Sequence, residues 1–201
     1  MSKRIERKQS IIQAAIEVFG EKNFANSTIS EIAEKANVAE GTIYQYFKNK
    51  EDLFFSIPLE KSMEFSRELE LHLQGIRGAS NKISKFIWYY LHFFTKNPGY
   101  GRTLLLEMRV SKNFVKTTAY KSFRPVTDGI LEIIKEGQRE GVVRGDVSIY
   151  IVRQLILGVL EHMVTRWLLS EERYDLLEHC DEVNKLIMDG MGMKADLNQL
   201  R

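Results

Sequence analysis

The chain has 201 residues, of which 44% are hydrophobic and 28% are charged, and this composition excludes an intrinsically disordered protein. Its one cysteine, Cys180, excludes a disulfide framework and a cysteine-rich zinc site. The net charge of +2 lies in the first 50 residues, which carry 8 Lys and Arg against 6 Asp and Glu.

The N-terminal segment predicts two helices separated by a short break. Residues 3–22 place apolar side chains at the i, i+3, i+4, i+7 spacing of an amphipathic helix. Gly20 and Asn23 predict its end. Thr28, followed three residues later by Glu31, has the pattern of a capping box. We therefore expect a second, shorter helix to begin at Thr28.

The next segment predicts a third helix over residues 39–47. Asn37 precedes it and tolerates the left-handed conformation that a tight turn needs. Asn49 is expected to cap a fourth helix. Two short helices joined by a tight turn and braced by a longer helix are typical of a helix-turn-helix.

The outward surface of the third helix suggests what this unit does. On a helix, Gly41 and Gln45 point away from the apolar Ile43. Such a surface suits a helix that enters the major groove of DNA. The residues alone leave a second interpretation open, a plain helical corner in which Tyr44 and Tyr46 are packed against the fourth helix.

The stretch GTIYQYFKNKEDL, residues 41–53, resembles the signature of the TetR family of bacterial transcriptional regulators. The segments TISEIA and ANV before it match the same signature, with Asn37 where the family more often has glycine. The resemblance implies phosphate contacts from Thr28, Tyr46, Lys48 and Lys50. It implies that the residues in the major groove are Glu40, Gly41, Thr42, Tyr44 and Gln45.

The rest of the chain predicts only helices. After the helix capped by Asn49, hydrophobic periodicity predicts helices over residues 81–97, 102–110, 115–141, 146–169 and 175–191. Pro98-Gly99 is expected to end the first of these, and Asp146 to cap the fourth. The predicted fold class is therefore all-α with about nine helices. A helix-turn-helix DNA-binding domain is expected over residues 1–49, with its motif at about 28–47, and a helical ligand-binding and dimerisation domain over 50–201.

The last two predicted helices each carry a second apolar face. One face serves the core of the subunit, and the other needs a cover, for which a symmetric partner is an economical solution. The alternative is that the preceding helices cover everything. The resemblance to the TetR family supports a homodimer with a four-helix interface. The residues expected in this interface are Leu155, Val159, Met163, Val183 and Ile187.

The aromatic-rich predicted helix over residues 81–97 has two interpretations, a packed core or part of the wall of a ligand cavity. The family resemblance favours the cavity. The segments LLEMR at 105–109, DGIL at 128–131 and RQLILG at 153–158 further resemble a TetR subgroup of fatty-acid-degradation repressors. In that subgroup long-chain acyl-CoA is the inducer. The ligand-binding residues that this resemblance implies are Trp88, Tyr89, Phe93, Leu105, Met108 and Arg109.

Other functions have less support in the sequence. The chain contains no G-x-S-x-G, H-E-x-x-H, Walker or dinucleotide-binding motif, so we expect no enzyme. The four histidines lack metal-ligand spacing, so no metal or cofactor is expected. The N-terminus lacks a secretory signal and no apolar stretch suits a membrane span, so a cytoplasmic protein is predicted.

The sequence thus predicts a dimeric repressor that binds a pseudo-palindromic operator in double-stranded DNA, is released by long-chain acyl-CoA, and controls fatty-acid metabolism. One alternative is a TetR-type repressor that responds to another hydrophobic ligand, such as a drug or an aromatic metabolite. Another is an acyl-CoA-binding protein without DNA binding.

Overall fold

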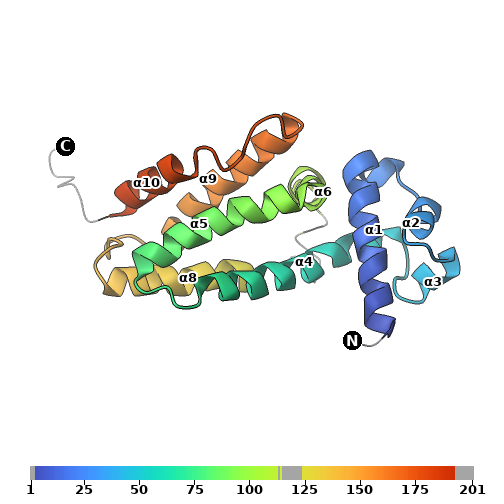
Figure 1. Cartoon of the computed structure of the whole chain (residues 1–201), viewed down its shortest axis with the longest axis horizontal. Coiled ribbons are helices and arrows are strands. Elements are labelled where there is room, and N and C mark those ends of the chain that lie inside the picture. Colours follow the sequence, from blue (N-terminus) through green and yellow to red (C-terminus); the bar gives the residue numbers. More distant parts are fainter. Residues whose placement is uncertain (1–2, 113, 115–123, 193–201) are drawn as a thin grey trace. The chain divides into compact units, whose positions relative to one another are not determined.

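The computed structural model describes residues 3–112, 114 and 124–192. All elements in these residues are helical, which confirms the predicted all-α class (Figure 1). They are α1 Lys3–Asn26, α2 Ile29–Lys35, α3 Glu40–Tyr44, α4 Lys50–Leu73, α5 Ala79–Lys96, α6 Pro98–Gly101, the π-helix η1 Arg102–Met108, α8 Arg124–Arg139, α9 Ile149–Leu169 and α10 Cys180–Met191.

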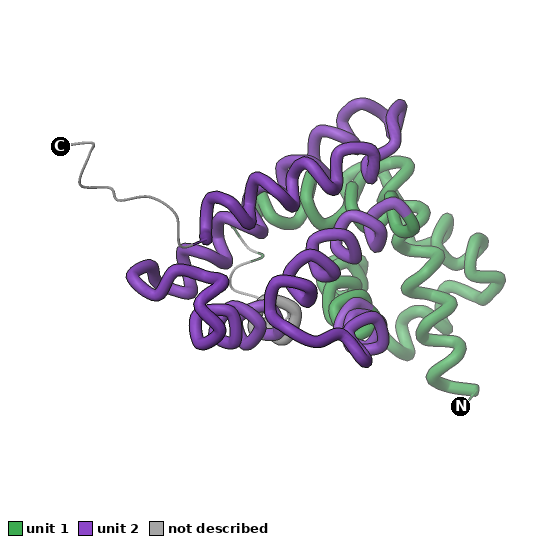
Figure 2. The backbone as a smooth tube through the Cα atoms, turned by 60° about the vertical axis from the view of Figure 1, so that its left-hand side comes forward, with its two compact units in different colours: residues 1–64, 96–124 green, residues 65–95, 125–201 purple. Residues whose placement is uncertain are grey.

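The chain divides into two compact units, coloured separately in Figure 2. Unit 1 consists of residues 1–64 and 96–124, and unit 2 of residues 65–95 and 125–201. The boundary falls inside α4, and α6 and η1 belong with the N-terminal helices. In each unit, packing unites segments that are distant in sequence.

Unit 1 has α1 at its centre, in contact with α2, α6 and η1. The side chains of Ile11, Ala15 and Phe19 on α1 are almost fully buried. Where α1 meets α6, Gly20 approaches Gly99 so closely that a Cβ at position 20 would lie 2.8 Å from the Gly99 Cα. The absence of two side chains is therefore what allows these helices to touch.

The predicted breaks and caps of unit 1 are largely confirmed. Asn23 has φ 64° and ψ 168°, so it interrupts the helix, although α1 continues to Asn26 beyond the expected end. Thr28 and Glu31 form both hydrogen bonds of the capping box. The Asn49 side chain accepts a hydrogen bond of 2.8 Å from the Asp52 N–H at the start of α4. The third helix is shorter than predicted, because only residues 40–44 are α-helical and a turn follows.

The segment after α5 agrees with its prediction only in part. Helix α5 ends at Lys96, just before Pro98-Gly99 as expected, but Pro98 also begins the short helix α6. A proline is tolerated in the first turn, where its missing N–H would have no helical partner. Residues 102–108 are helical as predicted, but they form a π-helix rather than an α-helix. Sequence periodicity does not distinguish these two windings over so short a segment.

Unit 2 contains α5, α8 and α9, which run lengthwise in Figure 1, and α10, which contacts α9. Phe65 lies among aromatic rings of α5, with ring centroids 4.9 Å from Tyr89 and 5.1 Å from Phe93. An ion pair of 2.7 Å between Lys82 and Glu136 joins α5 to α8. The core of this unit is therefore aromatic on the α5 side.

Three predicted helix starts in this region need correction or fall outside the description. The predicted helix over 115–141 is seen as α8 from Arg124, and residues 115–123 lie outside the described ones. The N-cap of α9 is Ser148, whose Oγ accepts a hydrogen bond from Tyr150 N, while Asp146 pairs with Arg144 instead. The last helix begins at Cys180 rather than at 175, because residues 176–179 form turns. Just before them, Trp167 Nε1 donates to Tyr174 O.

Within residues 3–112, 114 and 124–192, no helix combines the length and hydropathy needed to cross a bilayer. The same described residues contain no group of three His, Cys, Asp or Glu side chains that could hold a metal ion.

Candidate nucleic-acid interface

The turn between α2 and α3 has the geometry of a helix-turn-helix. Asn37 adopts φ 53°, the left-handed conformation expected at this position. The N–H of Val38 donates to Ala33 O over 3.0 Å, which closes the end of α2. Ile43 is fully buried, so it anchors α3 to the rest of unit 1. The two helices are thereby fixed with one face of α3 outward.

The outward face of α3 consists of residues that the sequence predicts there. Glu40, Gly41 and Gln45 are exposed, and 54% of Tyr44 is accessible. A Cβ at Gly41 would meet nothing within 4 Å. Thr42 and Tyr46 are half-buried. Tyr44 is therefore not packed in the core, and a short polar surface around a glycine is free to approach a groove.

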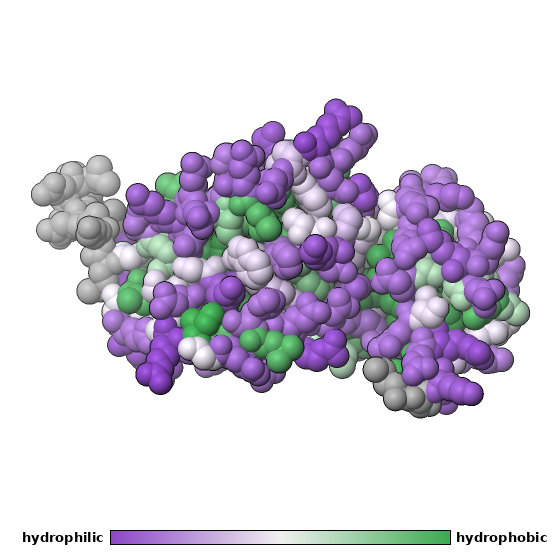
Figure 3. Space-filling view, viewed as in Figure 1, coloured by the Kyte–Doolittle hydropathy of each residue, from purple (hydrophilic) through white to green (hydrophobic). Residues whose placement is uncertain are grey.

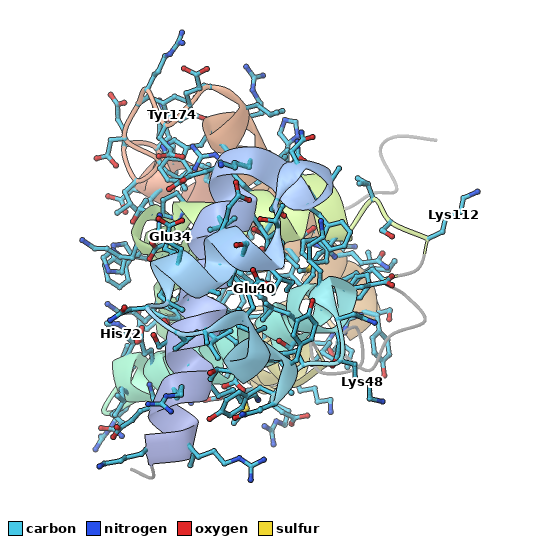
Figure 4. All side chains as sticks on the ribbon, turned by 90° about the vertical axis from the view of Figure 1, so that its right-hand side faces the viewer. Glu34, Glu40, Lys48, His72, Lys112 and Tyr174 are labelled. Atoms are coloured by element: carbon cyan, nitrogen blue, oxygen red, sulfur yellow. The ribbon has the colours of Figure 1, made fainter. Side chains whose placement is uncertain are left out.

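Two lysines near the end of α3 lie in different environments. Lys48 is exposed, on the side of unit 1 that faces the viewer in Figure 4, where Glu40 is also labelled. The Lys50 ammonium donates to the carbonyl oxygens of Phe24 and Ser27, over 2.7 Å in each case. It also lies 4.5 Å from the centroid of the Phe24 ring. Lys48 thus presents its charge to solvent, whereas Lys50 is bonded within unit 1.

Thr28 is occupied by the capping box at the start of α2. Its Oγ1 accepts from the Glu31 N–H and donates to Glu31 Oε2, and its own N–H donates to Glu31 Oε2 over 2.8 Å. A hydrogen bond from Lys22, and then the bonds from Thr28, lower the pKa of Glu31 below its usual range. The exposed threonine therefore marks a helix N-terminus whose first-turn N–H groups favour an anion.

Glu107 forms a hydrogen bond within unit 1 that the sequence does not indicate. Its carboxylate accepts a hydrogen bond of 2.7 Å from the Phe24 N–H. Burial raises the pKa of this carboxyl, and the bond from Phe24 opposes that rise. The two residues are 83 positions apart, so no local pattern could have indicated their contact.

The predicted ligand-binding residues are divided between the two units. Trp88, Tyr89 and Phe93 lie on α5 in unit 2, and Leu105, Met108 and Arg109 lie in or next to η1 in unit 1. Tyr89 and Phe93 are buried, and the Tyr89 hydroxyl donates to Glu68 over 3.0 Å. Trp88 is half-buried and stacks on His92 with a centroid distance of 4.8 Å.

On the unit 1 side of this predicted set, Leu105 and Met108 are buried and Arg109 is exposed. The apolar members other than the half-buried Trp88 therefore lie in the interior of their units, and the one charged member lies at the surface.

The predicted dimer residues differ in their exposure within one subunit. Leu155 is 43% exposed, Val159, Met163 and Val183 are half-buried, and Ile187 is only 4% exposed. Further exposed apolar residues that the prediction did not include are Tyr150, Ile151 and Leu186. Figure 3 shows apolar side chains at several places on the hydrophilic surface of unit 2. α9 and α10 therefore retain apolar surface that this subunit does not cover.

Comparison with known proteins agrees with this geometry. Residues 11–57 match the family described as bacterial regulatory proteins, tetR family, and residues 59–190 match the C-terminal region of YsiA-like proteins. The fatty acid metabolism regulator protein of Bacillus subtilis (strain 168) is 30% identical over 197 residues, 96% of this chain and 100% of that protein.

Solved structures of fatty-acid regulators are also similar. The transcriptional regulator FadR from Bacillus subtilis, in complex with stearoyl-CoA, superposes with a TM-score of 0.85 at 30% identity, covering 90% of this chain and 98% of that one. The fatty acid degradation regulator FadR from Bacillus halodurans gives the same TM-score at 27% identity, with the same coverage of each chain.

Proposed function

The chain belongs to the TetR family of bacterial transcriptional regulators, and on that premise we propose that it is a repressor released from DNA by long-chain acyl-CoA. The observation that carries the DNA-binding part is α3, whose Ile43 is fully buried while Glu40, Gly41 and Gln45 are exposed. A helix fixed in this way presents a short side-chain set to the major groove.

The DNA contacts follow from this placement. Glu40, Gly41, Thr42, Tyr44 and Gln45 are proposed to face the base edges. Thr28, the N-cap of α2, and Tyr46, which follows α3, are proposed, with Lys48, to contact phosphates. Residues 1–49 are proposed to read DNA and residues 50–201 to bind the effector and the partner subunit. Such a protein acts in the cytoplasm, where bacterial DNA is found.

The dimer is proposed to form through α9 and α10. A helix-turn-helix dimer binds two half-sites about one helical turn apart, so the operator is proposed to be pseudo-palindromic. The exposed apolar residues on these helices, among them Leu155 and Leu186, supply surface for a two-fold interface. Ile187 is buried inside its own subunit, so it contributes to such an interface only by supporting its neighbours.

The effector is proposed to be a long-chain acyl-CoA. The support is similarity over almost the whole chain to a fatty acid metabolism regulator and to a FadR structure that contains stearoyl-CoA. The apolar Trp88, Phe93 and Met108 are proposed to contact the acyl chain, and the exposed Arg109 suits a phosphate of coenzyme A.

Addition of palmitoyl-CoA is expected to release the protein from DNA. The probe is a duplex that the wild-type protein selects from a randomised pool, and its affinity is measured by fluorescence anisotropy. Because the two ligands favour different states, saturating palmitoyl-CoA should weaken duplex binding by about tenfold or more. Coenzyme A alone and a neutral detergent serve as controls. An unchanged affinity would reject acyl-CoA as the effector and direct the search to other hydrophobic ligands.

Lys48 and Lys50 are expected to respond differently to substitution. Lys48→Ala should reduce the slope of log affinity against log salt by about one for each phosphate that the variant no longer binds. Lys50→Met should remove the lysine donor from two part-buried carbonyls, so that Phe24 O keeps only the Ser27 hydroxyl and Ser27 O loses the ammonium. We expect this to lower the free energy of unfolding by about 1–3 kcal/mol. Salt titration and urea unfolding measure the two effects. If Lys50→Met changes the salt slope as much as Lys48→Ala, Lys50 also contacts phosphate.

A further inference from the structure

Residues 23–28, called the α1–α2 turn, comprise the end of α1 after its break at Asn23 and the link to α2, and two side chains from other parts of unit 1 hold them. Glu107 on η1 accepts the hydrogen bond from the Phe24 N–H, over 2.7 Å. Lys50 at the start of α4 donates to Phe24 O and to Ser27 O. The Ser27 hydroxyl also donates to Phe24 O, over 3.0 Å. Both polar groups of the Phe24 backbone are therefore bound to side chains.

The residue before Phe24 explains why the turn needs these bonds. Asn23 has φ 64° and ψ 168°, a backbone region that glycine enters freely and other residues enter at a cost. Such a conformation persists only where surrounding contacts determine it. The Asn23 side chain supplies one contact, by accepting from the Asn26 N–H over 3.0 Å, and Glu107 supplies the next by holding Phe24.

The winding of η1 determines where Glu107 lies. Arg109 N donates to Leu104 O over 3.0 Å, the five-residue spacing of a π-helix. Each π turn contains more residues than an α turn, so the side chains that follow are rotated relative to an α-helical course. Such π turns are rare in proteins, and those that occur are frequently at functional sites. The unusual winding and the Glu107 bond occur in the same seven residues.

We propose that Glu107 is a positioning residue for DNA binding. Its carboxylate fixes the Phe24 peptide, and this fixes the turn that leads into Thr28 and the N-terminus of α2. Glu107 itself contacts no DNA in this scheme. It acts by setting the direction in which α2 and α3 leave α1. The inference rests on the DNA binding proposed above and adds the residue that orients the reading unit.

The test compares three variants of the full chain without effector, using the duplex selected by the wild-type protein. Glu107→Ala removes the acceptor, and we expect duplex affinity to fall by about tenfold or more. Glu107→Gln keeps a carbonyl oxygen as acceptor for Phe24, so it should restore affinity to within about threefold of the wild type. Glu60→Ala is the matched control, since Glu60, on α4, also bonds to α1, through Lys8 over 2.8 Å, but away from the turn. It should stay within about threefold.

Amide hydrogen exchange at Phe24 provides a second measurement that does not depend on DNA. Exchange should be faster in Glu107→Ala and close to wild type in Glu107→Gln. Equal duplex affinity of Glu107→Ala and wild type, or an equal loss in Glu107→Gln, would overturn the proposal. If Glu107→Ala does not fold, Phe24 exchange in Glu107→Gln decides, because lost protection would overturn the proposal and retained protection would support it. A wild-type protein that selects no duplex would instead overturn the proposed function and this inference together.

Discussion

Replacing Leu155 and Leu186 together by glutamate is expected to make the protein monomeric. These residues lie on α9 and α10 and are 43% and 72% exposed in the single subunit. A dimer through these helices would bury both side chains, and burial of unpaired carboxylates opposes association strongly. Each subunit supplies one helix-turn-helix, so a dimer binds both half-sites of the duplex at once. The monomer should lose the affinity gained in this way, and duplex affinity should fall by about 100-fold or more.

Native mass spectrometry and duplex titration measure the two parts of this prediction. Leu71→Glu is the matched control, because Leu71 is 59% exposed but lies on α4 rather than on α9 or α10. The control should remain dimeric and bind the duplex normally. A double variant that stays dimeric at the concentrations used would show that the two-fold interface lies elsewhere.

Gly20→Val is expected to destabilise unit 1 strongly. A Cβ at this position would lie 2.8 Å from Gly99 Cα and 3.2 Å from Gly99 O, and these are backbone atoms that cannot rotate aside. Helix α1 must therefore move from α6, and we expect the free energy of unfolding to fall by about 3 kcal/mol. Gly20→Ala should lower the free energy of unfolding by less, because alanine is more favourable than glycine in a helix by about 1 kcal/mol.

Gly129→Ala is the matched control for the glycine substitutions. Gly129 also lies inside a helix, α8, but a Cβ there would meet nothing within 4 Å. The same chemical change should therefore stabilise the protein by up to about 1 kcal/mol. Urea unfolding followed by circular dichroism measures each variant. Wild-type stability in Gly20→Val would mean that α1 and α6 do not approach as closely as described.

Features set by neighbouring residues were predicted well from the sequence. The capping box of Thr28 and Glu31, the Asn49 cap and the left-handed Asn37 each depend on residues within a few positions. Hydrophobic periodicity also predicted that residues 102–108 are helical. Their π winding was not predicted, because the choice between an α and a π winding depends on the tertiary contacts that each winding makes.

In the candidate interface, too, local features were predictable from the sequence and long-range contacts were not. The exposed set on α3 followed from the position of Ile43, because helix geometry fixes what faces away from a buried residue. The internal bonds of Lys50 to Phe24 and Ser27 did not follow, since a lysine after a helix gives the same sequence pattern whether its ammonium meets solvent or backbone.

The all-α class, the helix-turn-helix and the membership of the TetR family could be predicted from the residues alone, because each depends on the short-range spacing of residue types. The packing of α6 and η1 with the N-terminal helices and the bond from Phe24 to Glu107 became visible only in the folded chain. Contacts across 83 positions depend on how the whole chain closes on itself. Local helix propensity does not predict such contacts. The entropy cost of bringing distant segments together and the packing that they gain depend on the whole folded unit.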